Sequence, residues 1–466
     1  MKRRDFSRAG IAGLAAGLAV CDESAGKDIK KTPAKKEAQK PYGIQYYEKA
    51  CEIWDLISTS ELPLIAQTAD RAAFSLKNGG KLYSQIVGGH MHDAELRPDR
   101  AGNPDYLHNW HRNVKDEEFD VIGKGDFIFF DFPRKHTQKA WERGAFTVGI
   151  RIPYFPNNTT PKGVLAMNEL AVNPVYENVI LPEECADIIL TSGVPFTDGV
   201  LFIPEIPAVR PCPISPQGTH NFFWMLTAEI AMRDKGGGAM GSTGKAREYI
   251  ELIKERGAKI RADFDNIDAI ARAMVVYVSH GAHYWNYPLR AHQNDLVMGN
   301  NLEWEIMVTE NTNRASGLVM SRLIDPKEIA DKGKPGDFVF IASEASDVKG
   351  NIEAARAFKN AGFKVIYIGP AKTEGSTGDN LVKLADWHID TYSPEREGVL
   401  SIPGFDRKLC PTTGVLYPLA QYMLNAQFIS HMIEADMTPL VFMGVHLIGG
   451  RVYYDLLQQI WEKRGY

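Results

Sequence analysis

Short apolar runs alternate with stretches of helical periodicity along most of the chain. In the first half, apolar runs at 80–87, 126–131 and 147–152 predict strands, and a helix is expected around 139–144. Strands joined by helices of about ten residues indicate βαβ units, in which the strands run parallel.

The second half shows the same alternation more clearly. An apolar run at 338–342 is followed by a helix expected at 351–361 and a strand at 364–368. The pattern predicts an α/β fold with doubly wound parallel sheets, which bind ligands at the loops leaving the carboxyl ends of their strands. The loops of interest are 88–95, 131–137, 279–292 and 342–350.

Three segments recur in the same order about 200 residues apart, which indicates a duplication. The matching segments are 125–129 with 336–340, 198–204 with 397–403, and Cys212-Pro213 with Cys410-Pro411. The chain is therefore expected to hold two tandem copies of one α/β domain, which form a pseudo-dimer.

The first twenty residues have a pattern typical of an export signal. Arg3 and Arg4 precede an uncharged run, 9–20, that is rich in Gly, Ala and Leu. This arrangement predicts a twin-arginine signal, which exports folded proteins. Cys21 follows directly, as in a lipoprotein processing site, although Val20 is bulkier than the residue usual before such a cysteine. We expect an extracytoplasmic protein, periplasmic or membrane-anchored through a lipid on Cys21.

These features divide the chain into five parts. They are a signal at 1–21, a disordered tether at 22–41, a first domain at 42–234, a Gly-rich linker at 235–245 and a second domain at 246–466. The tether is Lys-rich and nearly free of aromatic residues, so it cannot bury apolar surface. The linker resembles a phosphate-binding loop, but Lys245 precedes Ala246 instead of Ser or Thr, so a flexible connection is the better interpretation.

Composition narrows the class of partner. The 466 residues are 44% hydrophobic and carry a net charge of −5, with basic residues spread along the chain. We therefore expect no nucleic-acid partner. No apolar run after residue 20 is long enough to span a bilayer. The five cysteines form no CxxC pair, which favours buried thiols over disulfides or a zinc site.

Several motifs resemble the sugar isomerase (SIS) domain family. One is the Gly89-His90-Met91-His92 turn with Glu95 beyond it, and others are 343–346, 352–366 and 410–413. The resemblance implies five-stranded, flavodoxin-type parallel sheets, sugar binding at strand ends, and proton transfer between adjacent sugar carbons. The expected partner is a small-molecule sugar or sugar derivative, and a homo-oligomer is left open.

The chain departs from that family at the residues that would bind a phosphate. Phosphosugar members surround it with Ser and Thr hydroxyls and backbone N–H groups. Here Met91 replaces the serine of the first turn, and segment 279–283, taken as its counterpart in the second copy, has His or Ala there. Loop 131–136 holds no serine, and Glu344 would repel a phosphate. We expect a non-phosphorylated sugar.

Histidines near the loops are the first candidate site residues. His90, His92 and Glu95 are candidate catalytic residues, and His280 and His283 are candidate substrate-binding residues. They suit acid and base catalysis, because histidine titrates near neutral pH. A divalent metal held by His90 and His92 is an alternative, and so are histidines that only bond to the backbone. No cofactor is certain.

A second group of candidates lies in the other copy. Glu344 is a candidate catalytic base. The candidate substrate-binding residues are Ser343, Ser346, Asp347, Trp285, Thr412 and Thr413. Asp347 and the two threonines could instead cap helices, and Trp285 could instead belong to the core.

Three functions are left open by these residues. The first is a sugar isomerase, epimerase or lyase; the second is a catalytically silent sugar-binding protein; the third is a divalent-metal-dependent hydrolase. Because each copy carries half of a plausible site, we expect one site in the groove between the copies. It would combine His90, His92 and Glu95 with Ser343, Glu344 and Ser346.

Overall fold

The computed structural model divides into Met1–Lys40 and one compact unit, Pro41–Tyr466. It describes residues 40–85, 102–104, 106, 120–130, 133, 135–151, 180, 182–195, 198–207, 209–287, 322–371, 378–443 and 450–465. The expected signal at 1–21 lies outside these residues, as does the expected tether at 22–41 apart from its last two positions. Among the described residues, no helix is both long and apolar enough to cross a membrane.

The first half of the compact unit contains a parallel sheet in the order β1-β2-β3-β4. Its strands are β1 (Leu82–Gln85), β2 (Phe127–Phe130), β3 (Phe146–Arg151) and β4 (Ile188–Thr191). Its helical segments are α1 (Tyr42–Leu56), a π-helical turn (Ile57–Glu61), α2 (Leu62–Lys77), α5 (Lys135–Glu142), a 3-10 turn (Pro182–Glu184) and α7 (Ser215–Asp234).

The second half contains a parallel sheet in the order β6-β5-β7-β8-β9, a doubly wound arrangement. Its strands are β5 (Tyr284–Tyr287), β6 (Arg322–Leu323), β7 (Phe338–Ala342), β8 (Lys364–Gly369) and β9 (Trp387–Asp390). Its helical segments are α8 (Gly244–Ala262), α9 (Phe264–Ser279), a 3-10 turn (Pro326–Glu328), α11 (Ile329–Lys332), α12 (Lys349–Asn360), α13 (Leu381–Leu384), α14 (Thr413–Glu434) and α15 (Gly450–Arg464).

The predicted fold class is confirmed. The strand expected at 338–342 coincides with β7, and those expected at 126–131 and 364–368 differ from β2 and β8 by a residue at one or both ends. All four residues of β2 and all five of β7 are buried. Strands covered on both faces read as continuous apolar runs, which is why the sequence pattern located them.

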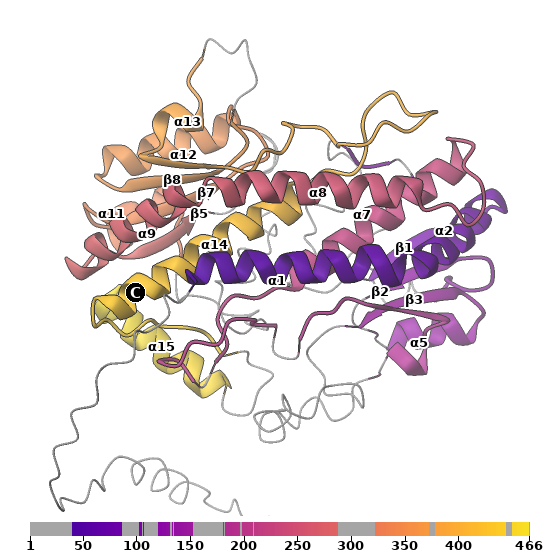
Figure 1. Cartoon of the computed structure of the whole chain (residues 1–466), viewed down its shortest axis with the longest axis horizontal. Coiled ribbons are helices and arrows are strands. Elements are labelled where there is room, and N and C mark those ends of the chain that lie inside the picture. The colour runs from indigo at the N-terminus through magenta and orange to yellow at the C-terminus, as the bar shows by residue number, and fades with distance from the viewer. Residues whose placement is uncertain are drawn as a thin grey trace, which may run out of the picture. The chain divides into compact units, whose positions relative to one another are not determined.

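Two long helices, α7 and α14, bury almost every side chain they carry. They pack on each other, and each also receives the first helix of the opposite half: α1 packs on α14, and α8 packs on α7. In Figure 1, α1 and α8 run side by side across the two halves. The halves therefore share one large hydrophobic core, to which these four helices and both sheets contribute.

Reciprocal contacts relate the two halves by a pseudo-twofold arrangement. The Cys212 thiol lies 3.6 Å from the carbonyl oxygen of Tyr422, and the Cys410 thiol lies 3.5 Å from that of Trp224. The same spacing separates both pairs, since 410 − 212 and 422 − 224 are both 198. Burial raises the pKa of both thiols, so these cysteines remain protonated donors within the core.

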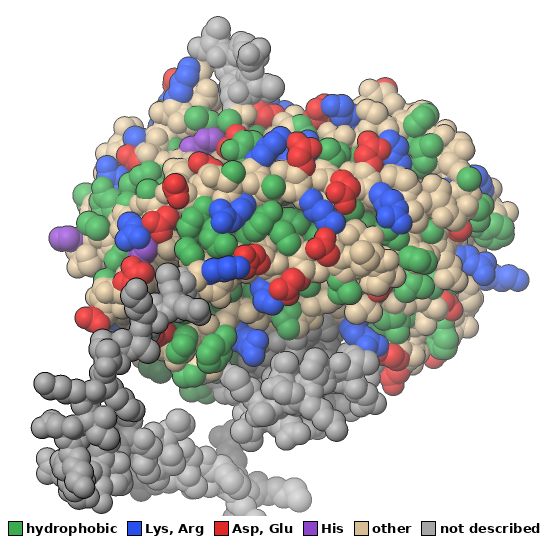
Figure 2. Space-filling model, viewed as in Figure 1, with side chains coloured by type: hydrophobic (Ala, Val, Ile, Leu, Met, Phe, Trp, Pro, Cys, Tyr) green, Lys and Arg blue, Asp and Glu red, His purple; other side chains and the backbone are tan. Residues whose placement is uncertain are grey.

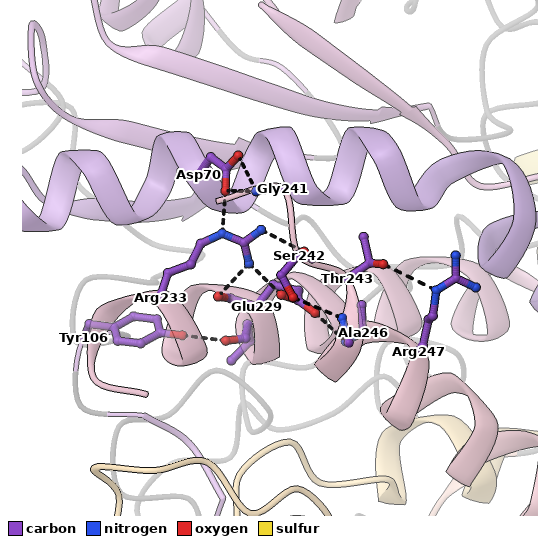
Figure 3. Close-up of polar contacts among 11 residues, drawn as sticks. Asp70, Tyr106, Glu229, Arg233, Gly241, Ser242, Thr243, Ala246 and Arg247 are labelled. Atoms are coloured by element: carbon purple, nitrogen blue, oxygen red, sulfur yellow. Dashed lines mark hydrogen bonds and ion pairs between the residues drawn. The ribbon is translucent and has the colours of Figure 1, made fainter. Parts of the chain in front are cut away.

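A buried ion cluster fastens the Gly-rich segment between the halves (Figure 3). Arg233 pairs with Glu229 at 2.6 Å and with Asp70, and it donates to the backbone oxygen of Ser242 at 2.8 Å. Asp70 also accepts the backbone N–H of Gly241 at 3.1 Å. The segment expected to be a flexible linker is thus held by hydrogen bonds on its backbone.

We predict that Arg233→Leu lowers the free energy of unfolding by about 3–5 kcal/mol, because it leaves the Glu229 carboxylate buried without its counter-ion. The double variant with Glu229→Gln should recover part of the loss, since an amide needs no counter-ion and its oxygen can still accept the Ala246 N–H. Urea unfolding measures the free energy of unfolding of the single and the double variant. A cost below about 1 kcal/mol for the single variant would contradict the role of this cluster.

Candidate functional site

Two loops of the second half leave the same edge of its sheet. One, 343–348, connects β7 to α12, and the other, 391–412, connects β9 to α14. Because all strands of this sheet are parallel, both loops lie at the carboxyl edge, where doubly wound sheets bind ligands. This edge contains most of the candidate residues that the structure describes.

Ser343 shapes the first loop. Its side chain is fully buried, donates to the backbone oxygen of Ala345 at 2.6 Å and accepts from the amide of Asn351 at 2.9 Å. A serine engaged in this way holds the turn between strand and helix.

Ser346 binds a carboxylate of the chain itself. Its backbone N–H and its hydroxyl both donate to one oxygen of Glu395, at 2.9 and 2.7 Å. Paired N–H and O–H donors at a strand-to-helix loop form a typical anion-binding arrangement. In this structure, Glu395 is the anion.

The next residue of each loop forms a second contact. Arg396 pairs with Asp347 at 2.6 Å, and both side chains are partly exposed. We call the Glu395–Ser346 and Arg396–Asp347 contacts together the edge latch. The alternative in which Asp347 caps α12 is wrong, because Val348 occupies the cap position and no side chain bonds there.

Tyr367 lies close to the edge latch. Its hydroxyl donates to the backbone oxygen of Pro370 at 3.0 Å. Burial raises the pKa of Tyr367 well above its usual value, and the negative charges of Glu395, Asp390 and Asp347 raise it further. This phenol therefore stays neutral and serves as a hydrogen-bond donor.

Thr412 and Thr413 begin α14 and are both buried. The Thr412 hydroxyl donates to that of Ser393 at 3.0 Å and makes no capping bond. Thr412 therefore occupies the cap position without satisfying the helix end through its side chain. Thr413 opens the first turn beside it.

In the first half, a carboxylate binds the start of α7, the helix equivalent to α14. Asp198, fully buried, accepts the backbone N–H groups of Ile214 and Ser215 at 2.9 and 2.7 Å, and the Ser215 hydroxyl at 2.6 Å. A negative charge at a helix N-terminus is favourable. Each half thus places one of its own carboxylates on donors of the anion-binding type.

Glu344 lies between the two serines of the loop and is 4% exposed. Within the described ranges it is the buried carboxylate candidate of this edge, whereas Asp347 is partly exposed and pairs with Arg396. A carboxyl in such a buried position suits proton transfer to and from a bound molecule.

The other described candidates lie at the opposite edge of the sheet. His280 directly follows α9 and His283 directly precedes β5, whose first residue pairs with the first residue of β7. A five-residue strand of about 15 Å separates that edge from Ser343. His280 and His283 therefore lie away from loop 343–348, which we call the serine loop.

His283 and Trp285 instead bind a core carboxylate. The backbone N–H of His283 and the indole N–H of Trp285 both donate to buried Asp337, each at 2.8 Å. Trp285 is 3% exposed and its ring packs on Trp461. These contacts are those expected if Trp285 belongs to the core.

The expected alignment of 279–283 with the Gly89–His92 turn is wrong. His280 follows α9 and is followed by Gly281, at φ +87°, as Asn78 follows α2 and is followed by Gly79, at φ +80°. Segment 279–283 therefore corresponds to the end of α2. His90, His92 and Glu95 lie outside the described residues, and so does the expected joint site with the serine loop. Among the described residues, no group of His, Cys, Asp and Glu could hold a metal ion.

The sequence interpretation missed the partners of the serine loop. These are Glu395, Arg396 and Asn351. Ser393, which bonds Thr412, and Tyr367, which bonds Pro370, were missed as well. Glu395 lies 49 residues after Ser346, and only the return of the chain through β8 and β9 brings them together. One signal was present: the β9–α14 loop contains the recurring segment 397–403, which begins two residues after Glu395.

Two curated bacterial proteins of the UPF0309 group resemble part of the chain. One, from Listeria monocytogenes, is 27% identical over 176 residues, which are 33% of this chain and 75% of that protein. The other, from Caldanaerobacter subterraneus, is 27% identical over 139 residues, which are 28% of this chain and 56% of that protein. No protein-family model matches the chain.

Solved structures with low sequence identity also align. The C-terminal domain of glucosamine-fructose-6-phosphate aminotransferase from Francisella tularensis has a TM-score of 0.42 and 11% identity, covering 86% of this chain and 98% of that one. Tagatose-6-phosphate ketose/aldose isomerase from Escherichia coli has a TM-score of 0.36 and 10% identity, and the alignment covers 85% of this chain and 92% of that one. Strand order and pairing define the fold independently of these likenesses.

We predict that Glu395→Ala lowers the free energy of unfolding by about 1–3 kcal/mol, because the donors of buried Ser346 lose their acceptor. Glu397→Ala is the matched control: its carboxylate pairs with Lys408 and both side chains are about half exposed, so it should cost less than about 1 kcal/mol. Thermal or urea unfolding of both variants makes the comparison. Equal losses would show that Glu395 acts only as a surface charge.

Proposed function

We propose that the chain handles a non-phosphorylated sugar or sugar derivative at the carboxyl edge of its second sheet, as an isomerase, epimerase or lyase. The supporting observation is the bond between Glu395 and both donors of Ser346. In SIS phosphosugar proteins, donors of this kind surround the phosphate. Here a carboxylate of the chain takes that place.

Charge favours a neutral ligand at this edge. A phosphate approaching Ser346 would meet the negative charge of Glu395 and would have to displace it from two hydrogen bonds. In the first half, Asp198 occupies the donors at the start of α7 in the same way. Sugar hydroxyls can instead donate to such carboxylates.

The chemistry proposed for the site is proton transfer next to a sugar carbonyl. A base removes a proton from one carbon, and the proton returns to the neighbouring carbon or to the opposite face of the same carbon. Glu344 is the proposed base in the described loop, and His92 is the proposed partner from the other half. Both assignments are predictions.

A sugar-binding protein without catalysis is the second candidate. It is favoured by the number of polar groups that this edge satisfies within the chain, since Ser343, Ser346, Asp347 and Thr412 all bond to neighbours. Side chains that bond within the chain can position a sugar without exchanging protons with it.

Solvent isotope exchange distinguishes the two functions. Incubated in D₂O with free sugars and sugar acids, the protein should place deuterium on the carbon beside the carbonyl, as followed by NMR. Glu344→Ala and His92→Ala should each slow exchange at least about 100-fold. Glu353→Ala, at an exposed position of α12, should leave exchange unchanged.

Two results would change this proposal. Heat stabilisation by a free sugar without deuterium incorporation would favour the binding protein. Stronger stabilisation by phosphosugars than by the corresponding free sugars would contradict the role given to Glu395.

We also propose that the protein acts outside the cytoplasm, on the pattern of Arg3, Arg4 and the apolar run 9–20. Replacing both arginines by lysine in the full-length, C-terminally tagged chain should retain it in the cytoplasm, because twin-arginine signals depend on this pair. Cell fractionation measures the distribution. Unchanged export would remove the twin-arginine assignment.

The charge on the folded surface agrees with a small neutral ligand. On the face in Figure 2, acidic and basic side chains alternate. Lys49 with Glu52 and Lys259 with Glu255 are examples on α1 and α8. A face of mixed sign does not attract a polyanion.

A further inference from the structure

The helix that follows β9, α14, starts differently from its counterpart in the first half, α7. The two helices begin at equivalent positions, because the repeat spacing of 198 residues relates Ser215 to Thr413. The residues just before them, Ile214 and Thr412, have similar backbone angles, with φ −118° and −107°. The hydrogen-bond donors of the two helix starts can therefore be compared one by one.

In the first half, every donor at the helix start is accounted for. Asp198 accepts the backbone N–H groups of Ile214 and Ser215, and it also accepts the Ser215 hydroxyl. The next residue, Pro216, has no N–H to satisfy. This helix start therefore holds one carboxylate on three hydrogen bonds.

In the second half, the same donors have no acceptor within the described part of the chain. The N–H groups of Thr412 and Thr413 make no hydrogen bond there. Gly414 stands in the place of Pro216 and adds a third N–H, which also has no acceptor among the described residues. These three groups lie at the N-terminus of a helix of 22 residues, where the helix dipole is positive.

The acidic side chain that could satisfy these donors is turned away from them. In the repeat, Asp198 matches Glu397. The carboxylate of Glu397 pairs with Lys408 at 3.5 Å, and both side chains are about half exposed. The second half has therefore kept the helix start but not the carboxylate that binds to it in the first half.

Buried hydroxyls add further donors around the start of α14. Thr413 is 4% exposed, and its hydroxyl has no partner among the described residues. Side chains of a helix tilt toward its N-terminus, so this hydroxyl lies on the side of the three N–H groups, as the Ser215 hydroxyl does in α7. Thr412 and Ser393 share one hydrogen bond between two hydroxyls, which leaves one of their two protons to donate. The hydroxyl of Thr391, in the same loop, is also buried without a partner.

This surplus of donors favours a bound group that brings acceptor oxygens. Buried donors that lack an acceptor are costly, and a negative charge is favourable at a helix N-terminus. A carboxylate supplies two acceptor oxygens and a full negative charge. Asp198 demonstrates that the equivalent groups of the first half hold a carboxylate on N–H and hydroxyl donors together.

We propose that the start of α14 binds the carboxylate of a sugar acid, and that Thr413 and Gly414 determine this specificity. The inference rests on the proposed function and narrows its substrate class to non-phosphorylated sugar acids. The edge latch limits the ligand to this single charge, because Glu395 already occupies the donors of Ser346. Apart from its carboxylate, the ligand carries neutral hydroxyls.

Binding of sugar acids and their parent sugars tests the assignment without requiring turnover. The full-length protein is titrated by calorimetry with D-glucuronate, D-galacturonate, D-gluconate and D-galactonate, and with D-glucose, D-galactose and their 6-phosphates. At least one acid should bind roughly tenfold more tightly than its parent sugar and its phosphate, because the carboxylate gains charge-assisted hydrogen bonds. If none of the four acids is preferred, or none binds, the proposal is wrong.

Two substitutions at the helix start locate the carboxylate. Gly414→Pro copies the first half and removes one N–H, and Thr413→Val removes the hydroxyl from a side chain of the same shape. Each should weaken binding of the acid roughly five- to tenfold and leave binding of the parent sugar unchanged. Neither should lower the stability to urea, because the donors removed have no acceptor among the described residues.

Ser215→Ala, at the equivalent position of α7, is the matched control. It removes a hydrogen bond to Asp198, so it should lower the stability to urea without changing affinity for the acid. Wild-type affinity for the acid in Thr413→Val and in Gly414→Pro would place the carboxylate elsewhere and overturn the proposal. Thr413→Val decides alone if Gly414→Pro does not fold.

Deuterium exchange separates this inference from the proposed function. An acid that depends on Thr413 for binding but takes up no deuterium would contradict the isomerase and support the carboxylate site. Deuterium uptake by neutral sugars, without preferential binding of any of the four acids, would support the isomerase and contradict the carboxylate site.

Discussion

The structure depends on the burial of two long helices against each other. Because α7 and α14 are enclosed on nearly all sides, water cannot satisfy their ends or their polar side chains, and the chain has to do so. Asp198 satisfies the start of α7, and the thiols of Cys212 and Cys410 reach carbonyl oxygens in the opposite helix. The exchanged helices α1 and α8 complete this enclosure. For this reason a duplicated chain forms one compact body although it contains two separate sheets.

The two halves have equivalent positions in the fold, but different residues occupy some of these positions. At one pair of equivalent places, Glu229 and Arg233 form a charged cluster while Gln427 and His431 form a partly neutral one. Each solution satisfies the same backbone requirement, the start of a helix from the other half. The two clusters differ in charge, because Arg233 is always charged and Gln427 places a neutral amide where the other half has the carboxylate of Glu229. Equivalent geometry therefore does not imply equivalent behaviour in the two halves.

Much of the fold could be predicted from the sequence, because strands buried on both faces appear as apolar runs and the repeat identified two copies. The serine loop could also be located, since Ser343 and Ser346 directly follow such a strand. The partners of that loop could not be predicted, because the Ser346–Glu395 contact depends on where the β9–α14 loop returns. The histidines of 279–283 were misplaced for a related reason: the presence of histidines suggested a match with the first turn, but the backbone feature that identifies the equivalent position is Gly281, at φ +87°. A conformational requirement identifies equivalent positions better than a residue type does.

The carboxylates that occupy anion-binding donors differ between the two halves, and this difference affects where a ligand binds. In the first half the carboxylate of Asp198 comes from the β4–α7 connection and binds the helix start, whereas Glu395, from the equivalent connection, binds a neighbouring loop instead. In the repeat, Asp198 matches Glu397, whose carboxylate pairs with Lys408, and Thr412 and Thr413 stand at the start of α14 without a side-chain cap. The same connection therefore closes a helix end in one half and bridges two loops in the other. A ligand at these edges would meet different donors in each half, so a single asymmetric site is a more natural outcome of this duplication than two identical ones.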